Sequence, residues 1–247
     1  DSYYESKTAR VPDDERTEEA DKVSARIAEL LGEQTFNFAP AEYISIHRRL
    51  FTGIYKFAGK IRDYNITKKE CVLRGNTVYY ASADSIRETL DYDFDQEKKF
   101  SYESLTLSES VKHITRFISG IWQIHAFGEG NTRTTAVFTI KYLRSFGFSV
   151  ENDSFAENSW YFRNALVRAN YADIKNGISY TSEYLEMFFR NLLMNEHNEL
   201  KNRYLLIGEN PFEKQSPADT EKPKYQNDTL KSPDYTLNDT LKCSLTE

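Results

Sequence analysis

Apolar residues recur at helical spacing along most of this chain, and this periodicity restricts the fold more than any other feature. Between Ser108 and Ile124 the apolar positions lie three or four residues apart, which places them on one face of an α-helix. The same spacing recurs in further stretches, namely 17–31, 42–57, a stretch from Asp84, 131–146, 157–172 and 180–205. Only ten glycines and six prolines occur, which argues against a β-sandwich with many turns. We therefore expect an all-α fold of six to eight helices.

Residues 64–80 depart from this helical spacing. They contain Val72, Val78 and Tyr80 on either side of Gly75-Asn76. β-branched and aromatic residues around such a dipeptide are typical of a β-hairpin with a primed turn. We expect one hairpin beside the helices.

The chain divides into three parts by composition. Residues 1–15 are polar and predict a loose lead-in, whereas 16–207 carry the periodic segments and predict one folded domain with a core at about 40–205. In residues 208–247 the apolar periodicity stops and four of the six prolines occur, which predicts a disordered tail. This tail is either a solvated linker or a recruitment segment in which Tyr225 and Tyr235 are phosphorylated.

Charge and cysteine content restrict the partners and the compartment. The net charge of -6 argues against general binding to nucleic acids or membrane surfaces. No apolar run approaches the roughly 20 residues that a membrane-spanning helix needs. Cys71 and Cys243 alone form neither a disulfide framework nor a zinc cluster, which favours a reducing compartment.

The segment His125-Ala-Phe-Gly-Glu-Gly-Asn-Thr-Arg133 lies between two predicted helices. Gly128 and Gly130 allow a tight turn and a close approach of a ligand to the backbone. The free N–H groups of a helix that begins near Asn131 favour an anion, above all a phosphate. Thr132 lies in this first turn, and Arg133 adds a planar cation for phosphate oxygens.

Two further side chains complete a candidate site in the same segment. Glu129 places a carboxylate beside the anion site, and one carboxylate together with phosphates is a common way to hold Mg²⁺. His125 can accept a proton from an attacking hydroxyl near neutral pH. Phe127 has no polar role and is predicted to anchor the segment in the core. The other histidines, His47, His113 and His197, lie in helical patterns and are assigned to core or surface.

This segment resembles the signature of the Fic (filamentation induced by cAMP) family, His-x-Phe-x-Asp/Glu-Gly-Asn-x-Arg. His125, Phe127, Glu129, Gly130, Asn131 and Arg133 fill the six fixed positions. The resemblance extends over most of residues 40–205, because 50–62 and 161–166 also look like helices of that family.

The resemblance implies an all-α bundle with a β-hairpin flap beside the active loop. It implies transfer of AMP from ATP to a Ser, Thr or Tyr hydroxyl of a target protein, with Mg²⁺ as cofactor. In that scheme His125 is the general base, Glu129 the Mg²⁺ ligand, and Arg133 neutralises the departing phosphates. The nucleotide phosphates bind at Gly128, Gly130, Asn131 and Thr132.

The same resemblance implies that the target docks on the flap by strand addition, around Lys68, Lys69, Val72, Val78 and Tyr80. It also gives two settings in which family members act, the bacterial cytoplasm and a host cell into which they are delivered. The sequence does not decide between these settings.

Two departures from the family pattern affect donor choice and regulation. A second Arg often follows the first by three residues, but here Ala136 stands in that place. The frequent inhibitory motif Ser/Thr-x-x-x-Glu-Gly/Asn is absent, so we predict that this form of autoinhibition is missing. Control by a separate inhibitory protein remains open.

Alternatives to adenylyl transfer therefore remain open. The missing Arg leaves other nucleotides open, and a Fic-fold kinase or phosphocholine transferase is a second hypothesis. A non-catalytic module that binds nucleotide or protein is a third, against which the presence of both His125 and Glu129 argues.

Overall fold

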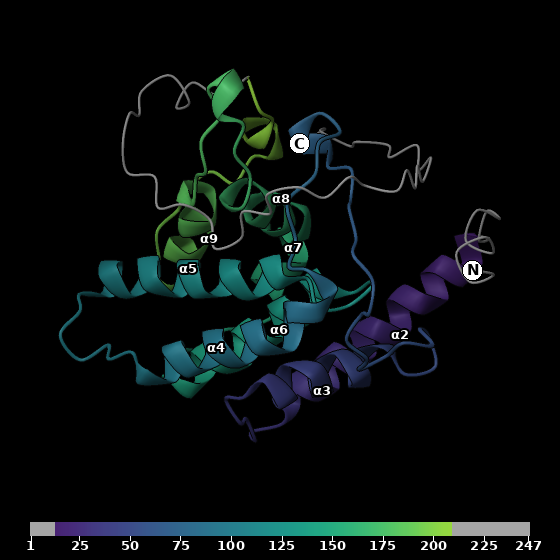
Figure 1. The fold of residues 1–247 in the computed structure, drawn as a ribbon. Helices are drawn as coiled ribbons and strands as arrows, with labels where there is room; N and C mark the ends of the chain where they lie inside the picture. The colour runs from purple at the N-terminus through teal and green to yellow at the C-terminus, as the bar shows by residue number, and fades with distance from the viewer. Residues whose placement is uncertain (1–12, 209–247) are drawn as a thin grey trace.

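The computed structural model describes residues 13–208 and shows eight α-helices, α2 to α9, with short 3₁₀ turns between them (Figure 1). The α-helices are α2 (Asp13–Gly32), α3 (Pro40–Phe51), α4 (Ile86–Lys99), α5 (Leu107–Ile124), α6 (Asn131–Ser145), α7 (Asp153–Glu157), α8 (Ser159–Ala169) and α9 (Glu183–Met194). The 3₁₀ turns are η1 (Cys71–Leu73), η2 (Ala83–Ser85), η3 (Ile174–Asn176) and η4 (Asn202–Leu205). The predicted all-α class is confirmed, while the predicted tail 208–247 lies almost wholly outside the described residues.

Helix α5 runs through the middle of the molecule and has neighbours on both sides (Figure 1). It contacts α4 and α6 on one side and α8 and α9 on the other, and α2 and α3 pack together against α6. Its apolar face is buried along its length, including Val111, Ile118 and Trp122. The site lies at the C-terminal end of this central helix, where the chain turns into α6.

Local signals in the sequence set several helix ends. Thr106 and Glu109 form a capping box at the start of α5, in which the Thr106 hydroxyl accepts from the Glu109 N–H. Pro40 occupies the first turn of α3. This helix ends at Phe51 rather than at the predicted Phe57, because Gly53 adopts a φ of 78° and breaks the helical path.

Two other predicted helices are shorter than their apolar patterns. The stretch 157–172 forms α8 only to Ala169, and the stretch 180–205 forms α9 only to Met194. Asn195, in the left-handed conformation at a φ of 53°, ends α9.

The predicted β-hairpin at 64–80 is not formed as paired strands, and residues 13–208 contain no strand. Glu70 N–H donates to the Asn76 carbonyl, but η1 and a turn through Arg74 and Gly75 fill the space between them. The Val72 carbonyl instead accepts a hydrogen bond from the Ile207 N–H, which does not belong to a neighbouring strand. A contact with the far end of the domain therefore replaces strand pairing.

Candidate active site

The chain reverses between α5 and α6 in the motif loop, residues 125–130. His125, at the end of α5, and Gly130, before α6, both adopt left-handed conformations, with φ of 52° and 80°. The Asn131 side chain closes the loop: its Nδ2 donates to the Phe127 carbonyl at 2.7 Å, and its Oδ1 accepts from the Phe127 N–H at 3.0 Å. The Asn131 side chain therefore fixes the loop backbone.

Both glycines of the motif loop are closely packed. A Cβ at Gly130 would lie 2.4 Å from the Phe51 ring, and one at Gly128 would lie 2.6 Å from the Tyr64 hydroxyl. Gly130 also has the positive φ that other residues rarely adopt. This packing favours glycine at both positions, whereas the close approach of a ligand to this backbone stays a prediction.

His47, on α3, hydrogen-bonds to the motif loop and packs against it. Its Nε2 donates to the Glu129 carbonyl and its Nδ1 accepts from the Gly59 N–H, both at 2.9 Å. Its ring stacks on Phe127 with centroids 3.7 Å apart. Burial lowers the pKa of His47 to about 4, so the ring is neutral at pH 7. The sequence assigned His47 only to core or surface, and nothing in its helical context indicated a contact 82 residues away.

The imidazole of His125 is almost completely enclosed. The residue is 3% exposed, and neither ring nitrogen has a hydrogen-bond partner among the described residues. The Tyr80 ring lies over it at a centroid distance of 4.1 Å, and the Trp122 ring meets it at 5.2 Å. Burial, followed by the charges of Lys68 and Arg62, holds the pKa of His125 well below its usual range. The ring is therefore a neutral proton acceptor.

Arg62 fastens the end of α5 to the segment that covers it. Its guanidinium donates to the carbonyls of Ile124 and His125, at 3.2 and 2.7 Å, and to those of Tyr64 and Ala81, at 2.7 and 2.5 Å. Burial lowers the pKa of Arg62 to about 10, which leaves it charged at pH 7. These bonds also satisfy carbonyls at the end of a helix, where a cation is favourable. We call residues 61–81 the cover segment.

The N-terminus of α6 is free of side-chain caps. Thr134 is the first residue to bond back, to the Gly130 carbonyl, so the amides of the residues before it have no helical partner. The Thr132 hydroxyl accepts from Trp122 Nε1 at 3.0 Å, which leaves its backbone amide as the group for a ligand. Uncapped amides and the positive end of the helix dipole favour an anion here.

Arg133 extends from the first turn of α6 into a partly exposed site. Its guanidinium donates to the Tyr55 hydroxyl at 3.0 Å and lies 4.8 Å from the centre of the Phe51 ring. Glu19 of α2 approaches it to 3.8 Å and also accepts from Tyr55. The Arg133 side chain is 41% exposed.

Glu129 provides an accessible carboxylate at the mouth of the motif loop. Its side chain is 42% exposed and pairs with Lys68 Nζ at 3.2 Å. No cluster of three His, Cys, Asp or Glu side chains suited to a metal occurs within residues 13–208. The donor set fits Mg²⁺ held by one carboxylate together with nucleotide phosphates, because this ion keeps several waters and accepts few protein ligands.

The predicted docking residues of the cover segment differ in exposure. Lys69 is exposed and Lys68 is partly buried, whereas the side chains of Val72, Val78 and Tyr80 are buried. In this conformation, a target protein that contacts Val72, Val78 and Tyr80 would contact their backbone and not their side chains.

Glu70 ties the cover segment to α8 through a buried ion pair that the sequence did not indicate. Its carboxylate is 1% exposed and accepts from both terminal nitrogens of Arg163, at 2.6 and 3.0 Å. The two residues lie 93 positions apart, so only the folded structure brings them together.

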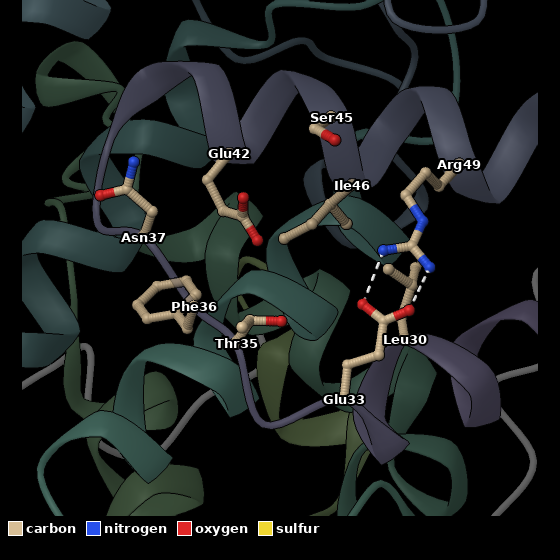
Figure 2. A pocket seen from close by; sticks show the side chains of 9 residues that line it. All are labelled: Leu30, Glu33, Thr35, Phe36, Asn37, Glu42, Ser45, Ile46 and Arg49. Atoms are coloured by element: carbon tan, nitrogen blue, oxygen red, sulfur yellow. Dashed lines mark hydrogen bonds and ion pairs between the residues drawn. The ribbon is translucent and has the colours of Figure 1, made fainter.

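One cavity lies away from the motif loop. It has a volume of about 270 Å³, lies between the end of α2 and α3, and contains the Glu33–Arg49 ion pair (Figure 2). None of residues 125–133 lines it. We assign the candidate site to the motif loop, because His125, the partly exposed carboxylate of Glu129 and the uncapped start of α6 occur there.

A neutral histidine, an accessible carboxylate and an uncapped helix N-terminus occur together at the motif loop. Residues 37–143 match the model of the Fic/DOC family. The resemblance seen in the sequence is confirmed. No helix within residues 13–208 is long and apolar enough to cross a membrane.

Three similar known proteins are consistent with the match to the Fic/DOC family. Over 170 residues the chain is 25% identical to a protein of Sinorhizobium fredii named "Probable protein adenylyltransferase y4lH", and the match covers 67% of this chain and 83% of that protein. The fold is similar to BepC, a VirB-translocated effector of Bartonella tribocorum solved with AMPPNP, at a TM-score of 0.57 and 18% identity, covering 77% of this chain and 90% of that one. A Bartonella quintana Bep effector Fic domain with ADP gives a TM-score of 0.54 and 18% identity, covering 74% and 86%.

Proposed function

We propose that this protein transfers a nucleoside monophosphate, AMP in the first instance, from a nucleoside triphosphate to a Ser, Thr or Tyr hydroxyl of a target protein. The observation that carries the proposal is the neutral, unpartnered imidazole of His125 beside the uncapped start of α6. The name of the Sinorhizobium fredii relative and the AMPPNP and ADP in the Bartonella structures support a nucleotide as donor.

In the proposed reaction the target hydroxyl oxygen attacks the α-phosphorus. The new oxygen–phosphorus bond replaces the bond to the bridging oxygen, pyrophosphate departs, and His125 takes the hydroxyl proton. The amides of Gly130, Asn131 and Thr132 stabilise the charge on the α-phosphate, and Arg133 neutralises the departing phosphates. Positioning and charge stabilisation carry such transfers, which suits a rigid loop on two helices.

Glu129 is the residue proposed to hold Mg²⁺. When bound there, the ion would neutralise charge on the α- and β-phosphates. Lys68 must then share or leave the Glu129 carboxylate, with which it is paired in this structure.

The cover segment is proposed as the docking site of the target protein, around Lys68, Lys69, Val72, Val78 and Tyr80. The exposed side chain of Lys69 supports the proposal, because it is accessible to an extended peptide that docks on this segment.

A labelling experiment tests the function. The protein is incubated with Mg²⁺, a cell lysate and each of labelled ATP, GTP, CTP and UTP, alongside His125→Ala. We expect label on a protein with at least one nucleotide and none with the variant. Absence of label with all four, or equal label with His125→Ala, contradicts the proposal.

The residue at position 136 bears on which donor molecule the protein uses. At this position of α6 the structure has a partly buried methyl group packed on the core instead of a cation. The terminal phosphate of a triphosphate would therefore have one cationic contact fewer, and kinase and phosphocholine transfer should be tested as well. The mass added to a modified target separates these reactions, and nucleotide affinity without turnover would indicate a binding module.

A further inference from the structure

The base of the proposed reaction is closed off from its acceptor in this structure. Both ring nitrogens of His125 are buried and unpartnered. A hydroxyl group must come within about 3 Å of one of them to transfer its proton. Something that covers His125 must therefore move before any acceptor can react.

Of the two aromatic rings that contact His125, the ring of Tyr80 is the nearer. Its centroid lies 4.1 Å from that of His125, and it also contacts Trp122, at 5.9 Å. The other aromatic neighbour, Trp122, is fully buried in α5 and donates to Thr132. Trp122 thus belongs to the rigid scaffold, whereas Tyr80 lies on the cover segment.

The backbone on both sides of Tyr80 is anchored. Gln123 Nε2 donates to the Tyr79 carbonyl at 3.0 Å, and Arg62 donates to the Ala81 carbonyl at 2.5 Å. Because both anchors come from residues at the end of α5 or bound to it, the main chain on both sides of Tyr80 is held. Opening is therefore expected as a change of side-chain rotamer.

Ring packing and one long hydrogen bond hold Tyr80 in its closed position. Its ring is buried against Trp122 and His125, and its hydroxyl donates to Glu70 at 3.4 Å. Glu70 binds Arg163 more closely, at 2.6 and 3.0 Å, so Glu70 is fixed mainly by Arg163. The ring, more than the hydroxyl, is therefore the part of Tyr80 that keeps His125 covered.

We propose that Tyr80 is a specificity-determining residue, whose ring must be displaced by the docking target before an acceptor hydroxyl reaches His125. The proposal rests on the proposed function for the identity of the acceptor. A target segment that cannot move Tyr80 leaves its hydroxyl outside the site, so recognition and access to the base are coupled.

Chemical modification of histidine tests the cover without any enzymatic assay. Diethyl pyrocarbonate reacts with accessible neutral imidazoles, and peptide mass mapping reports the rate at each histidine. In the wild type we expect His125 to react slowly and the exposed His197 to react fast. In Tyr80→Ala the rate at His125 is expected to rise about tenfold or more, because the group no longer depends on rare opening.

Two variants control for other effects of the substitution. Tyr79→Ala removes a neighbouring ring that is 68% exposed, and His125 should stay slow. Tyr80→Phe keeps the ring and loses only the bond to Glu70, and the rate should stay within about threefold of wild type. Equal rates at His125 in the wild type and Tyr80→Ala overturn the proposal, and so does a Phe variant as fast as the Ala variant.

The buried His47 reports on folding in the same experiment. If it becomes reactive in Tyr80→Ala, the protein has opened globally, and Tyr80→Leu replaces that variant with the same criteria. A second readout is the NMR titration of His125, whose pKa should rise toward 6.5 when the ring of Tyr80 is removed. Failure of nucleotide labelling alone would contradict the proposed function and leave these measurements intact.

Discussion

His47 uses both ring nitrogens to hold backbone groups, and this use requires one protonation state. Nδ1 accepts from the Gly59 N–H, so a proton on Nδ1 would oppose that donor. The folded-state pKa of about 4 lies below the value of 6.5 expected for the unfolded chain. The unfolded state therefore binds a proton first as the pH falls, and the stabilisation present above pH 6.5 is lost between pH 6.5 and 4.

We predict that His47→Gln flattens this pH dependence. A shift from 6.5 to about 4 corresponds to about 3 kcal/mol in the free energy of unfolding. Urea unfolding at pH 7 and pH 4 should show the variant losing about 3 kcal/mol less than wild type over this range. His125 adds to the slope in both proteins, so only the difference between them is diagnostic. An unchanged slope would show that His47 is not the titrating group.

Lys68 is paired with the Glu129 carboxylate, which we propose as the ligand of a divalent cation. We predict that Lys68→Met lowers the Mg²⁺ concentration needed for half-maximal binding of AMPPNP by about threefold, since partly exposed ion pairs are modest in strength. Calorimetric titration of the metal measures this directly.

Lys69→Met is the matched control, because it removes a neighbouring charge that is exposed. It should leave the metal requirement unchanged. Equal effects of the two variants would mean that net charge, rather than the pair with Glu129, sets the metal requirement.

The motif loop joins α5 to α6, and its two glycines are closely packed. Its glycines differ in what surrounds them: Gly130 faces the buried Phe51 ring at a positive φ, whereas Gly128 faces the hydroxyl of the partly exposed Tyr64. A side chain at Gly130 has no room to relax, but Tyr64 can swing away from one at Gly128.

We predict that Gly130→Ala lowers the free energy of unfolding by about 2–4 kcal/mol, from backbone strain and overpacking together. Gly128→Ala should cost less than about 1 kcal/mol, and Gly128→Ala with Tyr64→Phe less still. Urea unfolding of the three variants gives the comparison. Similar losses for Gly128→Ala and Gly130→Ala would contradict the packing described here.

The elements that the sequence predicted best are those governed by local signals. Helix α5 has a capping box and an unbroken apolar face, and the predicted start differs from the observed Leu107 by one residue. The hairpin prediction was wrong because Glu70 and Val72 bond to Arg163 and Ile207, which no local pattern reveals. In the same way, the motif loop could be found because its residues are consecutive, whereas His47 and Arg62 reach it only through the tertiary fold.

Over the whole molecule, the cover segment joins parts of the chain that are distant in sequence. Arg62 binds it to α5, Glu70 binds it to α8, and Ile207 bonds to Val72 near the last described residue. The position of this segment over the site therefore depends on the C-terminal third of the domain.

We predict that Arg163→Met weakens this connection and lowers the free energy of unfolding by about 3 kcal/mol, because it leaves the Glu70 carboxylate buried without its cation. Amide hydrogen exchange should increase first in the cover segment. The double variant Glu70→Gln, Arg163→Met should recover part of the loss, since the unpaired charge is gone. Unchanged exchange in the cover segment would contradict the role assigned to the pair.

The enclosure of His125 also affects a competing reaction with water. Water is the most abundant hydroxyl donor around any nucleotide, and a base open to solvent would activate it for hydrolysis of the triphosphate. Because the ring nitrogens are buried here, the proposed donor nucleotide would be protected until the proposed protein acceptor arrives. The packing that is expected to slow outside reagents at this histidine would thus also give the donor a long lifetime in the site.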